Sequence, residues 1–160
     1  MKITIRWVLL LSLSVCGAAH AVDIELMGYP TPTVTYKFVV YAGKTDRWDS
    51  ATRDSPPLSP AKASKVAGEV VRTVPLSDDM KAWRLSTITL QRMPSLPEDW
   101  FYIVHFDAQP KAAAKAADAN GLVRPVPWIS IPVRFDGTIP NPTITKSSKG
   151  RLTPRWSQPS

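Results

Sequence analysis

The sequence predicts an α+β fold, in which one main amphipathic helix packs on an antiparallel sheet of four or five strands. Several segments alternate apolar and polar residues with a period of two, which is typical of strands with one covered face. One segment repeats apolar residues at spacings of three and four, as an amphipathic helix does. The alternative fold is an all-β sandwich in which the helix belongs to a connection.

The first two strands are predicted in residues 22–26 and 34–42. The segment "VDIEL" alternates apolar and acidic residues, and the longer run "VTYKFVVYA" alternates over its whole length. The next stretch, 43–59, is polar and contains Pro56 and Pro57. We therefore expect a long loop there, a kind of segment in which function often resides.

The main helix is predicted from Pro60 to Val74. Ser59 provides a hydroxyl cap, and proline is tolerated at the first helical position because its missing N–H has no helical partner there. Pro75 ends the helix, since the residue before a proline is disfavoured in the helical region. The apolar positions at helical spacing are Ala63, Val66, Ala67, Val70, Val71 and Val74.

Three further strands are predicted after the helix. Residues 83–92, "WRLSTITLQR", and 99–108, "DWFYIVHFDA", read as an antiparallel hairpin, and residues 128–135, "WISIPVRF", form the last strand. Pro132 cannot donate to a ladder, which places this last strand at an edge or at a bulge. Residues 109–121 are rich in alanine and indicate a short, weakly packed helix.

The N-terminal residues 1–21 predict a secretory signal peptide. Lys2 and Arg6 precede an apolar run that is shorter than the roughly 20 residues needed to cross a bilayer, and small residues follow up to Ala21. A lipid anchor at Cys16 is the weaker alternative, because Val15 stands where such sites have a small residue. Cleavage would remove the one cysteine, and an exported chain without cysteine suits a bacterial periplasm.

The remaining chain is expected to form one domain over residues 22–139, followed by a basic, proline-rich tail over 140–160 without regular structure. The net charge of +7 does not belong to the domain, because two of the 20 basic residues lie in the leader and four in the tail. The domain is then nearly balanced, which argues against nucleic-acid binding. No segment after the leader is apolar enough for stable membrane insertion.

His105 is the one histidine beyond the leader, and it lies beside Asp107 on the more polar face of its predicted strand. The other face is expected to meet the helix through Trp100, Tyr102, Val104 and Phe106. One imidazole and no cysteine argue against a metal site, so no metal or cofactor is assigned. We interpret His105 as a half-exposed strand residue. The alternative is a general base oriented by Asp107.

Two arginine–tryptophan pairs are candidate partner-binding residues. Arg47 and Trp48 lie in the polar loop, and Arg155 and Trp156 lie in the tail. Tryptophan and arginine are enriched in protein interfaces, and neither tryptophan is easily assigned to a core. No sequence motif of a catalytic site accompanies them, so no catalytic residue is assigned.

The helix "LSPAKASKVAGEVV", the two strands of the predicted hairpin, and a last strand ending at Asp136-Gly137-Thr138 together resemble the layout of PepSY-like and cystatin-like exported domains. In such domains one helix lies across an antiparallel sheet. The resemblance covers about half of the chain and implies a non-catalytic domain that binds or restrains another protein, often an envelope enzyme.

The expected function is therefore that of an exported protein-binding module of the cell envelope, such as an inhibitor, an immunity-type protein or a small complex subunit. One alternative is a small hydrolase that uses His105 and Asp107. The other is a carrier of a small apolar ligand, which requires an internal pocket.

Overall fold

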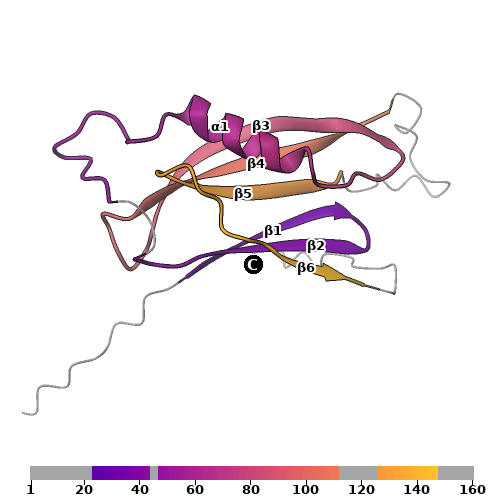
Figure 1. The fold of residues 1–160 in the computed structure, drawn as a ribbon, viewed down its shortest axis with the longest axis horizontal. Helices are drawn as coiled ribbons and strands as arrows, with labels where there is room; N and C mark the ends of the chain where they lie inside the picture. The colour runs from indigo at the N-terminus through magenta and orange to yellow at the C-terminus, as the bar shows by residue number, and fades with distance from the viewer. Residues whose placement is uncertain (1–22, 44–46, 112–125, 148–160) are drawn as a thin grey trace, which may run out of the picture.

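The computed structural model describes residues 23–43, 47–111 and 126–147, which form one helix and one six-stranded sheet (Figure 1). The elements are β1 (Ile24–Thr31), β2 (Val34–Val40), α1 (Pro60–Val71), β3 (Met80–Arg92), β4 (Trp100–Pro110), β5 (Trp128–Arg134) and β6 (Thr143–Lys146). The strands follow one another in the order β3-β4-β5-β1-β2-β6, and all pairings are antiparallel.

The predicted combination of one helix and an antiparallel sheet is confirmed, but the sheet has six strands instead of four or five. The described part is mostly sheet and in this respect lies closer to the all-β alternative. The additional strand is β6, which occupies part of the segment predicted as a tail without regular structure. Thr143, Ile144 and Thr145 are β-branched and pair with β2, where Ile144 lies opposite Tyr36.

Helix α1 begins as predicted and ends earlier. The Ser59 hydroxyl accepts the backbone N–H of Lys62 at 3.3 Å, which satisfies one of the free donors of the first turn. After Val71 the backbone hydrogen bonds span three residues instead of four, and the N–H of Val74 donates to the Val71 carbonyl at 3.1 Å. This three-residue spacing is that of a 3₁₀ turn, so Val74 still faces the core although the α-helix has ended.

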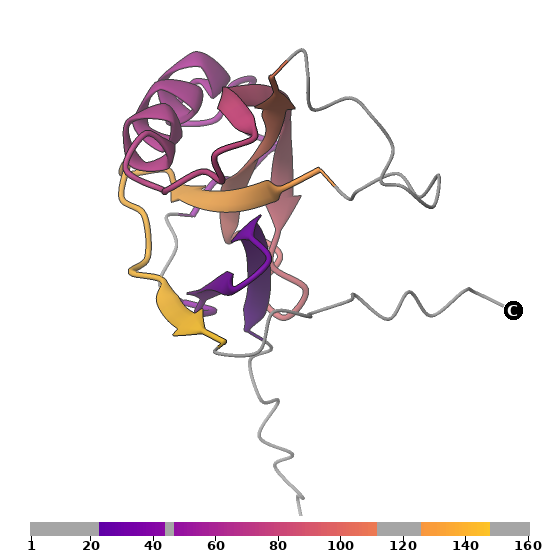
Figure 2. The ribbon, with the colours of Figure 1, turned by 90° about the vertical axis from the view of Figure 1, so that its right-hand side faces the viewer.

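The larger of two buried apolar clusters lies between α1 and the sheet, on the side seen in Figure 1 (Figure 2 shows the same layer edge-on). The smaller one consists of Val40, Met93 and Phe101. The helix packs on β3, β4 and β5 through its small buried residues Ala63, Ala67 and Val71. The β4 face predicted to meet the helix does so. The apolar face continues onto β5, because Val104 pairs with Ile131 and both side chains are fully buried.

Strand β5 is internal in the described sheet, whereas the sequence predicted an edge or a bulge at Pro132. Strand β1 pairs with β5 only at Trp128 and Ile129, so Pro132 lies where β4 is the one neighbour of β5 among the described strands. The missing N–H is therefore tolerated within an internal strand. At the β1 crossing, a Cβ on Gly28 would lie 2.9 Å from the Cβ of Ile129 and 3.1 Å from its Cα. Only glycine fits there.

Tyr102 ties the loop before the helix to the sheet. Its hydroxyl is buried and donates to the Leu58 carbonyl at 2.8 Å, and burial raises the pKa of Tyr102 above its ordinary value of 10.0. As the pH rises past this ordinary value, the unfolded chain loses the proton first. The free energy of unfolding therefore falls above about pH 10.

We expect Tyr102→Phe to lower the free energy of unfolding by about 0.5–1.5 kcal/mol at neutral pH, because the Leu58 carbonyl loses its donor. The variant should also lose less stability than the wild type between about pH 9 and about pH 11. Urea unfolding at both pH values measures the two effects. An equal alkaline loss in both proteins would contradict the role of Tyr102.

Candidate functional site

The sheet face opposite α1 carries a group of polar and aromatic side chains, which we call the open face. Directly paired residues of antiparallel strands point to the same side of a sheet. One cross-strand row therefore contains Arg84, Asp107, Trp128 and Tyr29, and the next contains Thr87, His105 and Ser130. Helix α1 lies on the other side of the sheet, as Figure 2 shows.

His105 is fixed at the centre of the open face by both of its ring nitrogens. Nδ1 lies 2.9 Å from the Ser130 hydroxyl, and Nε2 lies 3.3 Å from a carboxylate oxygen of Asp107. In the neutral ring, an Nε2–H donates to Asp107 and Nδ1 accepts from Ser130. The side chain of His105 is 29% exposed and that of Asp107 is 46% exposed, whereas Ser130 is buried.

Two aromatic rings continue this group across the sheet. The ring of Trp128 is tilted by 35° against His105 at a centroid distance of 5.4 Å. Trp128 also meets Tyr29 edge-on at 5.3 Å. Three ring side chains from β4, β5 and β1 therefore hold one another in place, and each is only partly buried.

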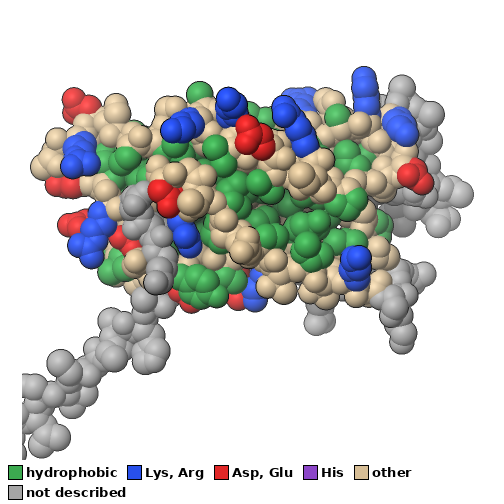
Figure 3. Space-filling model, viewed as in Figure 1, with side chains coloured by type: hydrophobic (Ala, Val, Ile, Leu, Met, Phe, Trp, Pro, Cys, Tyr) green, Lys and Arg blue, Asp and Glu red, His purple; other side chains and the backbone are tan. Residues whose placement is uncertain are grey.

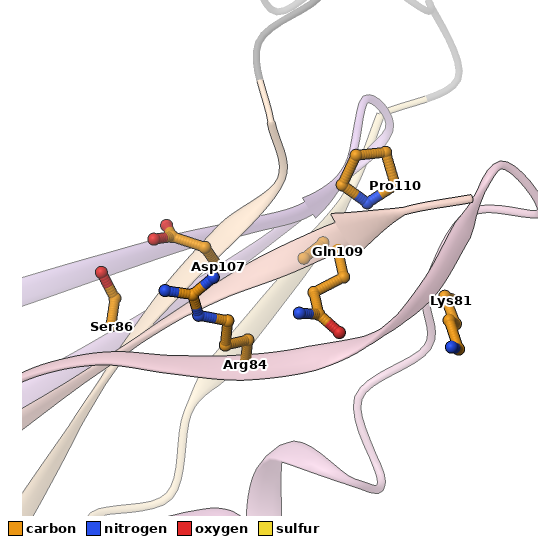
Figure 4. A pocket seen from close by; sticks show the side chains of 7 residues that line it. Lys81, Arg84, Ser86, Asp107, Gln109 and Pro110 are labelled. Atoms are coloured by element: carbon orange, nitrogen blue, oxygen red, sulfur yellow. The ribbon is translucent and has the colours of Figure 1, made fainter. Parts of the chain in front are cut away.

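A hollow of about 640 Å³ borders the open face at Asp107 (Figure 4). Its walls are Lys81, Arg84, Ser86, Asp107, Ala108, Gln109 and Pro110. The hollow lies where the pairing of β3 with β4 is irregular, near Met80–Ala82 and again near Leu85–Thr87. Two cations and one carboxylate line it, so it suits a polar or charged group better than an apolar one.

Tryptophan, tyrosine and arginine, as they occur on the open face, are the residue types that dominate protein interfaces. The chain matches no family model, no curated protein and no solved structure. The chemistry of the open face is therefore the basis for inferring its function.

Within the described ranges, no group of three or more histidine, cysteine, aspartate or glutamate side chains is arranged to hold a metal ion. In the same part of the chain, no helix has the length and apolar character needed to cross a membrane.

Trp48 lies in the core, a position that its polar neighbours in the sequence did not suggest. Its side chain is 8% exposed and meets Trp100 at 5.3 Å and Phe135 at 6.1 Å, both edge-on. The loop returns to the sheet because Arg47 bridges to Asp99, and the N–H of Trp48 donates to the Glu98 carbonyl at 2.8 Å. This backbone pairing directs the indole inward.

The buried carboxylate of Asp99 strengthens the same junction, because it accepts the N–H of Gly43 at 2.8 Å. The Arg47 side chain remains 74% exposed, 4.0 Å from carboxylate oxygens of Glu98 and Asp99. Arg155 and Trp156 lie outside the described residues, as do the leader over 1–21 and most of the predicted helix over 109–121. The partner-binding role of both arginine–tryptophan pairs stays a prediction.

Sequence alternation placed His105 and Asp107 on one face, and the structure confirms this. This alternation within one strand did not show that Ser130 lies beside His105. Trp128 and Tyr29 were missed as members of the site. Their meeting depends on the pairing of β1 with β5, which joins distant parts of the chain.

Proposed function

We propose that this protein is an exported, non-catalytic module that binds another protein of the cell envelope, and that the open face contacts this partner. The observation that carries the proposal is the ring group of Tyr29, Trp128 and His105. Strands hold these side chains in fixed positions, so little conformational entropy is lost when a partner covers them. Arg84 and Asp107 flank the rings and would supply polar contacts at the rim.

Two features support binding over catalysis. Ser130 is buried, so a substrate has little access to its hydroxyl. Ser130 also sits within a paired strand, where its backbone is opposite His105 of β4. An oxyanion needs free N–H donors aimed at the reacting atom, and a ladder strand directs its N–H groups to the neighbouring strands instead.

The test is capture of a partner from periplasmic extract on the immobilised chain 22–160, followed by titration of the captured protein. We expect Trp128→Ala to weaken binding at least about 30-fold, as removal of a central interface aromatic does. Asp107→Lys should also weaken it, and this residue is exposed enough for the fold to tolerate the change.

The matched control is Tyr41→Ala, since Tyr41 is 52% exposed and lies outside the open face. It should bind as the wild type does. Unchanged affinity in both Trp128→Ala and Asp107→Lys would remove the open face from the proposal. Failure to capture any partner would contradict the binding function itself.

A small hydrolase is the second candidate function, and one observation favours it. The Ser130 hydroxyl, His105 and Asp107 form a continuous chain of hydrogen-bonding atoms, which could pass a proton from serine to histidine. The two functions differ in the effect of His105→Ala. Ester hydrolysis that is absent from the wild type, or unchanged in a stable His105→Ala variant, eliminates the hydrolase, whereas ester hydrolysis lost in both His105→Ala and Ser130→Ala would replace the binding proposal.

A further inference from the structure

Strand β3 forms one border of the sheet, and among the described strands none lies beyond it. Its 13 residues make it the longest strand. An unpaired edge of this length presents a row of free N–H and C=O groups to any extended chain. Proteins commonly protect such an edge with charges, prolines or bulges, so the distribution of these features along β3 is informative.

The two halves of β3 differ in protection. The first half has irregular pairing near Met80–Ala82 and Leu85–Thr87, and it carries Lys81 and Arg84. The second half, Thr87–Arg92, pairs with β4 without interruption. It has no proline and no charge before Arg92, and its threonine, isoleucine and leucine residues favour a strand.

The register identifies which backbone groups of this second half point outward. The N–H of Met93 donates to the Asp99 carbonyl at 2.9 Å. Alternate residues of an antiparallel ladder bond to the same neighbour, so Thr87, Thr89 and Gln91 bond to β4. The N–H and C=O groups of Ile88 and Leu90 are then directed away from the sheet.

The charge along this border defines the kind of chain that fits it. Strand β3 contains Lys81, Arg84 and Arg92 and no acidic residue. The exposed side of α1 adds Lys62 and Lys65, against Glu69. Figure 3 shows Lys and Arg side chains along the upper border, over α1 and β3, with fewer acidic ones between them.

A second copy of this chain is a poor occupant, because two β3 strands carry only cations and gain no ionic contact from pairing. An acidic segment instead gains from the same cations.

The border also has room for an apolar side chain. A second hollow, of about 580 Å³, opens between the end of α1 and the start of β3. Its walls are Gly68, Val71, Arg72, Val74, Pro75, Leu76, Ala82, Trp83 and Phe106. The indole N–H of Trp83 donates to the Val74 carbonyl at 3.2 Å and so fixes the junction of helix and strand.

We propose that β3 binds an extended acidic segment of the partner by strand addition, with main-chain hydrogen bonds to Ile88 and Leu90. Acidic side chains of the segment meet the cations of β3 and α1, and one apolar side chain enters the hollow at Trp83. This mode uses the backbone for affinity and the flanking charges and hollow for specificity. The inference rests on the proposed binding function. It adds to that function the mode of binding and the chemistry of the partner segment.

The test compares Leu90→Pro with Leu90→Ala. Both variants remove the leucine side chain, but only proline also removes the outward N–H. The probe is a labelled ten-residue peptide of alternating valine and glutamate, with alternating valine and lysine as its control. We expect the acidic peptide to bind the wild type and Leu90→Ala, and to bind Leu90→Pro at least about tenfold more weakly. The lysine peptide should bind none of them.

A double variant, Lys81→Glu with Arg92→Glu, tests the charge without changing the ladder, since both side chains are exposed. It should lose the acidic peptide even if Leu90→Pro does not fold. Equal binding of both peptides, or equal affinity of the double variant and the wild type for the acidic one, would overturn the proposal.

The captured partner separates this proposal from the function on which it rests. Partner binding that is lost in Trp128→Ala but kept in both Leu90→Pro and the double variant would retain the binding module and reject strand addition. If the peptide binds as expected but no envelope protein is captured, strand addition stands and the proposed function falls.

Discussion

Replacing Trp48 with alanine is expected to lower the free energy of unfolding by about 3–5 kcal/mol, the usual cost of removing a large buried aromatic. Trp48 is almost fully buried and contacts the rings of Trp100 and Phe135, so alanine leaves a cavity between the loop and the sheet. Chemical denaturation at neutral pH measures the loss as a lower midpoint with an unchanged slope.

Trp48→Phe is the control for this prediction. The indole N–H of Trp48 has no hydrogen-bond acceptor in the described part of the structure, so phenylalanine sacrifices size but no hydrogen bond. We therefore expect a smaller loss than for alanine. If Trp48→Ala unfolds like the wild type yet no longer captures the partner, the indole belongs to an interface and its placement in the core is wrong.

The second large effect is expected at the crossing of β1 and β5. Gly28→Ala should destabilise the protein by about 1–3 kcal/mol, because the new Cβ overlaps both the side chain and the Cα of Ile129. Backbone cannot move aside as a flexible side-chain end can. The pairing of Gly28 with Ile129 would be displaced, and the connection between the two parts of the sheet would weaken.

Gly68→Ala is the matched control, since it adds the same methyl group where no atom beyond its chain neighbours and the backbone of its own helix lies within 4 Å. Gly68 is in the interior of α1, where glycine costs about 0.5–1 kcal/mol relative to alanine. This variant should therefore be more stable than the wild type. Equal thermal midpoints for the two glycine variants would refute the steric explanation.

The helix and most strands could be predicted from the sequence because apolar residues repeat along each of them with the period of that element. The helix start at Ser59 and Pro60 follows from capping chemistry, and the buried face of β4 follows from alternation. The helix end was missed by three residues, since the 3₁₀ turn keeps Val74 in the apolar pattern. Strand β6 could not be predicted because all four of its residues are exposed. It therefore has no buried face for a sequence pattern to show.

The site was readable only in part, because it is made by pairing between distant strands. His105 and Asp107 share a face within one strand, and period two is enough to show this. The proximity of Ser130, Trp128 and Tyr29 depends on which strands become neighbours. Trp48 shows the same limit in a loop: its polar neighbours suggested exposure, and only the backbone pairing near Asp99 brings it into the core.

The place of β1 in the sheet has a consequence for how the chain folds. Tyr29 pairs with Trp128, roughly 100 residues later, so β1 gains its second neighbour only near the end of the chain. When synthesis delivers the N-terminus first, β1 and β2 emerge as a two-stranded hairpin, which is marginally stable alone. One side of β1 then stays unprotected until β5 arrives. A chaperone that shields this strand during the delay would raise the yield of folded protein without binding to the folded state.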